Sequence, residues 1–180
     1  MIDLPALLED VADGTRRLVG RRPVRVRVEC GVARLRSDPA RVRQILSNLA
    51  TNAAKFTARG EIRFTARPSP GGVVLQVSDT GLGIPPEKHD LIFRAFEQVA
   101  PEASREAPDG GIGLGLAIVK QLCDLLDGGV EVASEPGQGA VFTVRLPDLP
   151  GEPARAPAAS PIALGADPRP ESEEPLRAIS

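Results

Sequence analysis

The chain has 180 residues, of which 42% are hydrophobic and 3% aromatic, and its formal net charge is −2. This length suits one globular domain with additional sequence, and the balanced charge provides no basic surface for nucleic acid. The chain has no Trp and no Tyr to stack on single strands, so we expect no nucleic-acid partner. No apolar run reaches the roughly 18 residues of a membrane span, and Asp3, Glu9 and Asp10 stand where a signal peptide is positively charged. We therefore expect a cytoplasmic chain without membrane contact.

The composition changes after Pro147. Residues 148–180 are rich in Pro, Ala, Glu and Ser and lack periodic hydrophobicity, so they cannot bury enough apolar surface to offset their ordering entropy. We expect residues 1–147 to form the folded domain and residues 148–180 to be a disordered tail or linker. Cys30 and Cys123 have no CxxC spacing and no histidine cluster, and we interpret both as buried structural thiols.

The N-terminal third predicts a helix, a hairpin and a second helix. Apolar residues at helical spacing indicate a helix over residues 3–19. Valines then alternate with charged residues over 24–28, and we expect a hairpin between this strand and residues 32–36, turned at Cys30-Gly31. Asp38 followed by Pro39 is typical of a helix N-terminus, and this helix should run to about Phe56.

The remaining elements complete a sheet. Residues 62–67 and 73–77 alternate in hydrophobicity around a Pro-Gly-Gly turn and should pair antiparallel. A short helical piece is expected over 88–96, and a longer helix over about 113–127 is apolar almost all round, which predicts deep packing. Residues 130–134 and 140–146 should form a closing hairpin. The pattern indicates an α+β sandwich with helices on one face of the sheet.

A polar stripe runs along the helix expected over residues 39–56. Asn48, Asn52 and Lys55 fall within about 60° of each other around the helix axis. A separate apolar arc consists of Val42, Ile45, Leu46, Leu49, Ala53 and Phe56. Amide oxygens suit a partly hydrated Mg²⁺, and a lysine can offset polyphosphate charge, so the stripe is a candidate site for a metal-bound phosphate. The alternative is the solvated edge of an ordinary amphipathic helix.

Two glycine-containing segments provide further candidates. Asp79 ends a strand and is followed by Thr-Gly-Leu-Gly-Ile, where a carboxylate can accept a hydrogen bond from an exocyclic amine and the glycines admit a flat ring. The alternative is a turn that caps a strand. Residues 110–116, GGIGLGL, open a helix, and free amides at a helix start form an anion site. Residues 85–112 lie between the two segments, and we interpret them as a mobile lid.

Taken in order, NLATNAAKFT, DTGLGI, IFRAFEQV, GGIGLGLAIVKQL and EPGQGAVFTVRLP resemble the N box, glycine boxes and F box of sensor histidine kinase catalytic domains. The resemblance covers residues 3–147 and implies the Bergerat-type ATP-binding fold. That fold is a two-layer α/β sandwich with a mixed, mostly antiparallel sheet covered on one face by three helices. The implied activity is transfer of the ATP γ-phosphoryl group to a histidine on a separate dimerisation domain. A response regulator receiver domain is the implied further partner.

The resemblance also implies residue roles. Asn52 would hold Mg²⁺ with assistance from Asn48, Lys55 would contact phosphate, and these three form the catalytic set. Asp79 would bind the adenine amine. The other implied ATP-binding positions are Gly81, Gly83, Ile84, Phe93, Phe96, Gly111, Ile112, Gly113, Leu114, Gly115 and Leu116. Among them the two phenylalanines would anchor the lid, and Ile112 stands where many members carry Thr.

Three functional hypotheses follow. Hydrolytic relatives of this fold, such as gyrase, mismatch-repair and heat-shock chaperone ATPases, carry a glutamate at the place of Asn48, and an amide cannot take a proton from water. The leading hypothesis is therefore a histidine kinase catalytic module. The alternatives are a nucleotide-binding regulatory module without transfer activity and an anti-sigma-type serine kinase. The one histidine, His89, lacks an acceptor-helix pattern and is interpreted as a solvated loop residue, and without dimerisation helices we expect a monomer.

Overall fold

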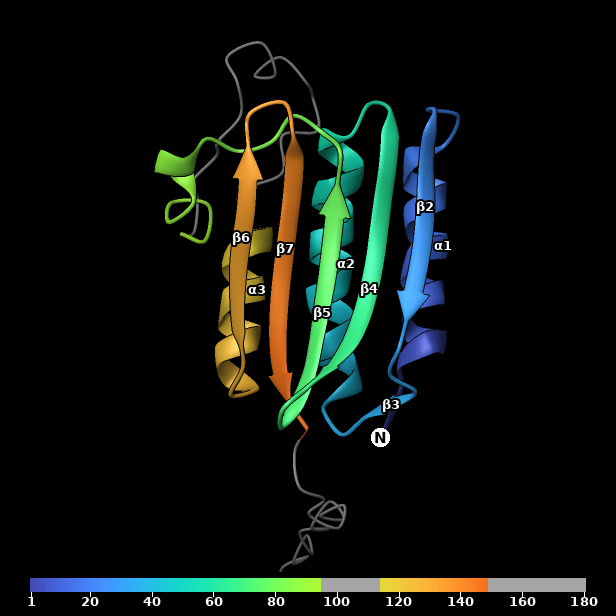
Figure 1. Cartoon of the computed structure of the whole chain (residues 1–180), viewed down its shortest axis with the longest axis vertical. Helices are drawn as coiled ribbons and strands as arrows, with labels where there is room; N and C mark the ends of the chain where they lie inside the picture. The colour runs from blue at the N-terminus through green and yellow to red at the C-terminus, as the bar shows by residue number, and fades with distance from the viewer. Residues whose placement is uncertain (95–113, 149–180) are drawn as a thin grey trace, which may run out of the picture.

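The computed structural model describes residues 1–94 and 114–148, which form a sheet with three helices on one face (Figure 1). The helices are α1 (Leu4–Val19), α2 (Pro39–Phe56) and α3 (Gly115–Leu125), and the strands of the main sheet are β2 (Val24–Cys30), β4 (Gly60–Ser69), β5 (Gly72–Asp79), β6 (Gly129–Glu135) and β7 (Gly139–Pro147). These five strands lie in the order β2-β4-β5-β7-β6. Of these strand pairs, β2–β4 is parallel and the others are antiparallel. The predicted two-layer, mostly antiparallel sandwich is confirmed.

Helix α2 forms where the sequence predicts it. The Asp38 carboxylate accepts hydrogen bonds from the amides of Ala40 and Arg41, and Pro39 occupies the first helical position. The predicted apolar arc is buried except for Phe56, which is half-buried. This arc packs on the sheet face made by Ile62, Phe64, Ala66, Val73, Leu75 and Val77. The core of the sandwich therefore forms where the apolar side of α2 packs against every second residue of the strands.

The opposite face of the sheet is polar. On β2 and β4, Arg27 pairs with Glu61 at 3.1 Å and Arg63 pairs with Glu29 at 3.5 Å. These side chains alternate with the buried ones, as the pleat requires. The period-two pattern in the sequence thus sorts each strand into a core side and a charged side.

The predicted hairpin between residues 24–28 and 32–36 is wrong. Strand β2 instead pairs parallel with β4, with α2 in the crossover between them. The second predicted strand shrinks to β3 (Arg34–Leu35), which pairs with β1 (Ile2–Asp3) in a separate small sheet. Leu35 and Ile2 are both buried, so this small sheet seals the core at one end.

Helix α3 is less deeply packed than its apolar sequence predicts. It buries Ala117, Val119 and Cys123, but Ile118 is 37% and Leu125 is 59% exposed. The helix packs on α2, β6 and β7 at the side of the layer, so a single stripe faces the core. Of the two cysteines, Cys123 is buried as expected, whereas Cys30 is half-buried.

Two other predicted segments differ from the structure or extend beyond it. The expected helix over 88–96 is a 3₁₀ turn, η1 (Pro86–Lys88), followed by turns up to Arg94.

At the other end of the chain, the Asp148 carboxylate accepts hydrogen bonds from the Arg36 amide at 3.0 Å and guanidinium at 3.1 Å. Residues 149–180 lie outside the described part, so the predicted tail stays a prediction.

Candidate nucleotide-binding site

The predicted polar stripe lies along the C-terminal half of α2. Asn52 is half-buried and makes no hydrogen bond to the described residues, and Lys55 is exposed with its Nζ 5.3 Å from the centroid of the Phe56 ring. The Asn48 Oδ1 accepts a hydrogen bond from the Gln44 side chain at 3.0 Å, and its Nδ2 donates to the Gly115 carbonyl at 3.2 Å. Asn48 therefore ties α2 to the beginning of α3, whereas Asn52 makes no such link to the part of the chain that the structure describes.

Asp79 ends β5 at the edge of the sheet where α2 also ends (Figure 1). Its Oδ1 accepts a hydrogen bond from the Gly81 amide at 2.8 Å. Burial raises the pKa of the Asp79 carboxyl, and the amides of Gly81 and Ala140 and the Thr57 hydroxyl partly counter the increase. Because a carboxylate has about four acceptor positions, half-buried Asp79 can accept a further hydrogen bond from a ligand amine.

The loop after Asp79 is joined to the end of α2. The Leu82 amide donates to the Phe56 carbonyl at 3.3 Å. A Cβ at Gly81 would lie 2.4 Å from the same carbonyl oxygen, so only glycine allows this approach. This junction places the carboxylate of Asp79 beside the turn of α2 that carries Asn52 and Lys55.

The same loop docks on the turn between β6 and β7. The Ile84 amide donates to Ser134 Oγ at 2.8 Å, and the Gly137 amide donates to the Leu82 carbonyl at 2.8 Å. Gly83 has a φ of +70°, and a Cβ there would lie 1.9 Å from the Glu135 carbonyl oxygen. Ser134 was not predicted from the sequence, because a serine in an edge strand gives no signal for a contact made 50 residues away.

Thr57 was also missed, although it directly follows the polar stripe. Its side chain is fully buried, and Oγ1 has no hydrogen-bond partner among the described residues, although it is close enough to Asp79 to favour the ionised carboxylate. A buried hydroxyl without a partner costs free energy unless a ligand or a water meets it. The Thr57 hydroxyl therefore lies next to the Asp79 carboxyl, where it can help to receive the polar edge of a ligand.

The predicted phosphate segment is described only in part. Leu114, Gly115 and Leu116 open α3, and a Cβ at Gly115 would meet no atom of the described residues within 4 Å. Gly111, Ile112, Gly113 and Phe96 lie outside the described residues, as does most of the predicted lid, so their roles stay predictions.

The described start of the predicted lid is held against the domain. Phe93 packs edge-to-face on Phe142 with ring centroids 6.4 Å apart, and its role as a lid anchor stays a prediction. His89 Nε2 lies 3.2 Å from the Ile84 carbonyl oxygen. This histidine is half-buried rather than solvated.

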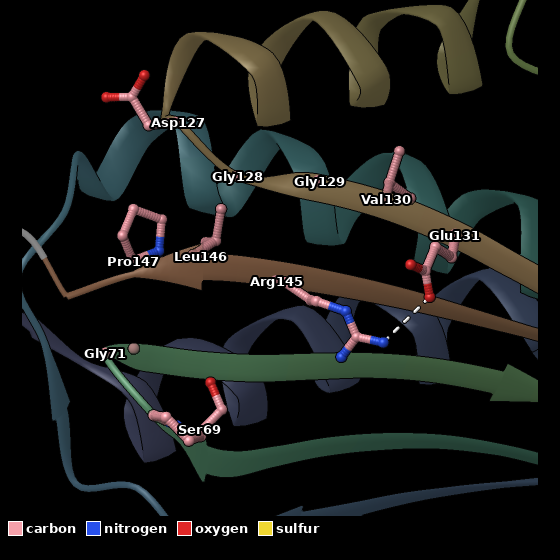
Figure 2. A pocket seen from close by; sticks show the side chains of 12 residues that line it. Ser69, Gly71, Asp127, Gly128, Gly129, Val130, Glu131, Arg145, Leu146 and Pro147 are labelled. Atoms are coloured by element: carbon pink, nitrogen blue, oxygen red, sulfur yellow. Dashed lines mark hydrogen bonds and ion pairs between the residues drawn. The ribbon is translucent and has the colours of Figure 1, made fainter.

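A cavity of about 450 Å³ lies at the other end of the sheet (Figure 2). Its lining includes Gly71, Gly72, Gly128 and Gly129, and the Arg145–Glu131 ion pair crosses its side. The strand register places these residues at the opposite end of β5 from Asp79. The cavity is therefore separate from the candidate site.

Two features are absent from residues 1–94 and 114–148. No helix in this part of the chain combines the length and apolar character needed to cross a membrane. In the same residues, no cluster of three or more His, Cys, Asp or Glu side chains could hold a metal.

Residues 37–150 match the family described as histidine kinase-, DNA gyrase B-, and HSP90-like ATPase. The autoinducer 2 sensor kinase/phosphatase LuxQ of Vibrio parahaemolyticus is 45% identical over 117 residues, covering 62% of this chain and 13% of LuxQ. The sensor histidine kinase RcsC of Escherichia coli K12 is 43% identical over 113 residues, covering 63% of this chain and 12% of RcsC. This chain thus spans a small part of the curated relatives.

Solved structures agree with these matches. Full-length ShkA in complex with AMPPNP superposes with a TM-score of 0.72 and 36% identity, over 81% of this chain and 30% of ShkA. The solved chain of the mycobacterial sensor histidine kinase MprB gives a TM-score of 0.65 and 28% identity, over 83% of this chain and 97% of that solved chain. Because the family match extends over more than half of the sequence, this chain belongs to the histidine kinase-, DNA gyrase B-, and HSP90-like ATPases.

Proposed function

We propose that this chain is the ATP-binding catalytic module of a two-component sensor histidine kinase and presents the ATP γ-phosphoryl group to a histidine on a separate phosphoacceptor domain. The observation that carries the proposal is the junction between the Asp79 loop and the end of α2, made by the Leu82 amide and the Phe56 carbonyl. Through this junction Asp79, which is suited to adenine, lies beside the end of α2, where Asn52 and Lys55 are suited to a metal-bound polyphosphate. The relatives named above are sensor kinases, which supports the same activity.

Each residue has a role in this proposal. Asp79 accepts a hydrogen bond from the adenine amine, and Gly81 and Gly83 let the backbone approach the base. The Asn52 amide oxygen would hold Mg²⁺, a hard cation that prefers oxygen ligands. Lys55 is a mobile cation that neutralises phosphate charge. When bound, Mg²⁺-ATP supplies an activated phosphoryl group whose charge is partly neutralised by the metal.

Position 48 favours transfer over hydrolysis. Both polar atoms of Asn48 are engaged with Gln44 and Gly115, and an amide has no basicity at neutral pH with which to activate water. An acceptor imidazole brings its own nucleophilic nitrogen, so positioning is enough for transfer. The phosphoacceptor domain, in the same chain or another, and a receiver domain are the proposed partners. A cytoplasmic location follows, because ATP is available there.

Calorimetric titration tests the first part of the proposal. The purified chain should bind ATP in the presence of Mg²⁺ and more weakly without it. Asn52→Ala should lose the magnesium dependence, while a substitution at the distant cavity, such as Arg145→Gln, should leave binding unchanged. Equal ATP affinity in wild type and Asn52→Ala would contradict the assignment of Asn52.

A transfer assay tests the second part. Radiolabelled ATP is incubated with the chain and a purified histidine phosphoacceptor domain, and the label is then tested in acid. Acid-labile label on the acceptor supports the histidine kinase. Acid-stable label on a serine would support the anti-sigma-type kinase instead, and binding without transfer to any acceptor would support a regulatory module.

A further inference from the structure

Arg22 joins the C-terminal ends of two helices. It lies in the short loop between α1 and β2 and is half-buried. Its Nε donates to the Val19 carbonyl at 3.1 Å, and its Nη2 donates to the Leu18 carbonyl at 3.1 Å. These two carbonyls belong to the last turn of α1, where backbone acceptors have no partner within the helix.

The other arm of the same guanidinium reaches α2. The Arg22 Nη1 donates to the Ala54 carbonyl at 2.6 Å and to the Thr57 carbonyl at 3.0 Å. A cation at the negative end of two helix dipoles is favourable, and a planar group with five donors can serve four carbonyls together. The adjoining residue Pro23 adds a link, since its carbonyl accepts from the Gly60 amide at 2.9 Å. Arg22 thus fixes where α2 ends relative to α1.

The segment that Arg22 holds belongs to the candidate site. Ala54 and Thr57 flank Lys55 and Phe56, and the Phe56 carbonyl accepts from the Leu82 amide of the Asp79 loop. The Thr57 hydroxyl faces Asp79, while the carbonyl of the same residue is bound by Arg22. Figure 1 shows the loop before β2 at the same end of the sheet as the end of β5. A displacement of the Arg22 guanidinium would therefore move the groups that line the base.

We infer that Arg22 is a positioning residue for the adenine end of the site: it holds the last turn of α2 so that Thr57 and the Asp79 loop keep the geometry that selects an amino purine. The inference rests on the proposed ATP binding. Arg22 does not touch the nucleotide in this account and acts through the backbone carbonyls of Ala54 and Thr57. Its removal should consequently weaken selection of the 6-amino group more than it weakens binding of the triphosphate.

The test compares ATP with inosine triphosphate, which carries an oxo group in place of the 6-amino group. Affinities are measured by competition against a fluorescent ATP analogue for wild type, Arg22→Gln, Arg22→Lys and Arg21→Gln. Arg21 is exposed in the same loop and makes no hydrogen bond or ion pair with the described residues. Arg21→Gln is therefore the control that removes the same charge as Arg22→Gln without removing contacts. Circular dichroism and thermal melting show whether each variant is folded.

For Arg22→Gln we expect ATP affinity to fall about tenfold, inosine triphosphate affinity to change less than twofold, and Arg21→Gln to behave as wild type. Arg22→Lys keeps the charge without the planar fork, so it should melt near the wild-type temperature yet lose part of the discrimination. Unchanged discrimination in both Arg22 variants would overturn the inference. Equal weakening of both nucleotides, or unfolding of Arg22→Lys, would also overturn it, because Arg22 would then support the fold alone. Failure of wild type to bind ATP would instead refute the proposed function.

Discussion

Gly83→Ala is expected to separate the Asp79 loop from the turn between β6 and β7. A Cβ at this position would lie 1.9 Å from the Glu135 carbonyl oxygen, far inside van der Waals contact, so the two segments must move apart. The two hydrogen bonds that join them, Ile84 to Ser134 and Gly137 to Leu82, are both 2.8 Å long and would be lost or stretched. Because the loop carries Asp79, the displacement should weaken ATP binding.

The magnitude follows from two contributions. A left-handed backbone costs a non-glycine residue about 1–2 kcal/mol, and loss of two hydrogen bonds adds about 1 kcal/mol each. The total is about 3–4 kcal/mol, which corresponds to a decrease in melting temperature of about 10 °C at roughly 3 °C per kcal/mol for a domain of this size. If the loop detaches locally, the decrease in melting temperature will be smaller, but the loss of ATP affinity should still be at least about tenfold.

The matched controls are Gly71→Ala and Gly137→Ala. These glycines have φ values of +76° and +77°, close to the value at Gly83, but a Cβ at either position meets nothing within 4 Å. They should show the backbone strain alone, about 1–2 kcal/mol, with ATP affinity unchanged in calorimetry. Wild-type ATP affinity in Gly83→Ala, or an equal loss in the controls, would refute the steric reasoning.

Three other changes give distinct signatures. Asp38→Ala removes the cap on two amides of α2 and should cost about 1 kcal/mol in thermal unfolding, with ATP affinity kept because the cap lies at the far end of the helix; a loss of affinity would contradict this. Asn52→Ala should abolish the magnesium dependence of ATP binding without changing the melting temperature, and a large drop in that temperature would show a structural role. Asp79→Asn should weaken ATP binding but not the fold. Because burial raises the pKa of Asp79 above 3.8, ionisation of this carboxyl costs stability as the pH rises through the folded-state value. The free energy of unfolding of Asp79→Asn should therefore decrease less than that of wild type between pH 4 and 7. Parallel pH profiles of the two proteins in denaturant titrations would contradict a raised pKa for Asp79.

The sequence by itself determined those helices and strands that depend only on residues a few positions apart. Asp38 and Pro39 specify the beginning of α2, and the period-two valines specify β2 because capping and pleating depend on immediate neighbours. The same patterns indicated Asp79 and the Asn52–Lys55 stripe, since a carboxylate at a strand end and amides beside a core arc are visible without knowing the partners. The prediction of a two-layer sandwich also rested on these periodicities.

Only the tertiary structure decided which distant groups meet. The alternation in β2 fits any neighbouring strand, and the nearby turn favoured a hairpin, whereas burial of α2 against the sheet placed β4 beside it in parallel. Helix α3 is apolar on nearly all sides, so its sequence could not show that only one side would pack against the core. Arg22 reaches the Ala54 and Thr57 carbonyls, and Ser134 accepts from the Ile84 amide, across more than 30 residues of sequence. Backbone carbonyls and amides carry no signature in a sequence that would reveal such contacts. The roles of Arg22 and Ser134 follow from the relative placement of helix ends and turns, which packing of the whole domain determines.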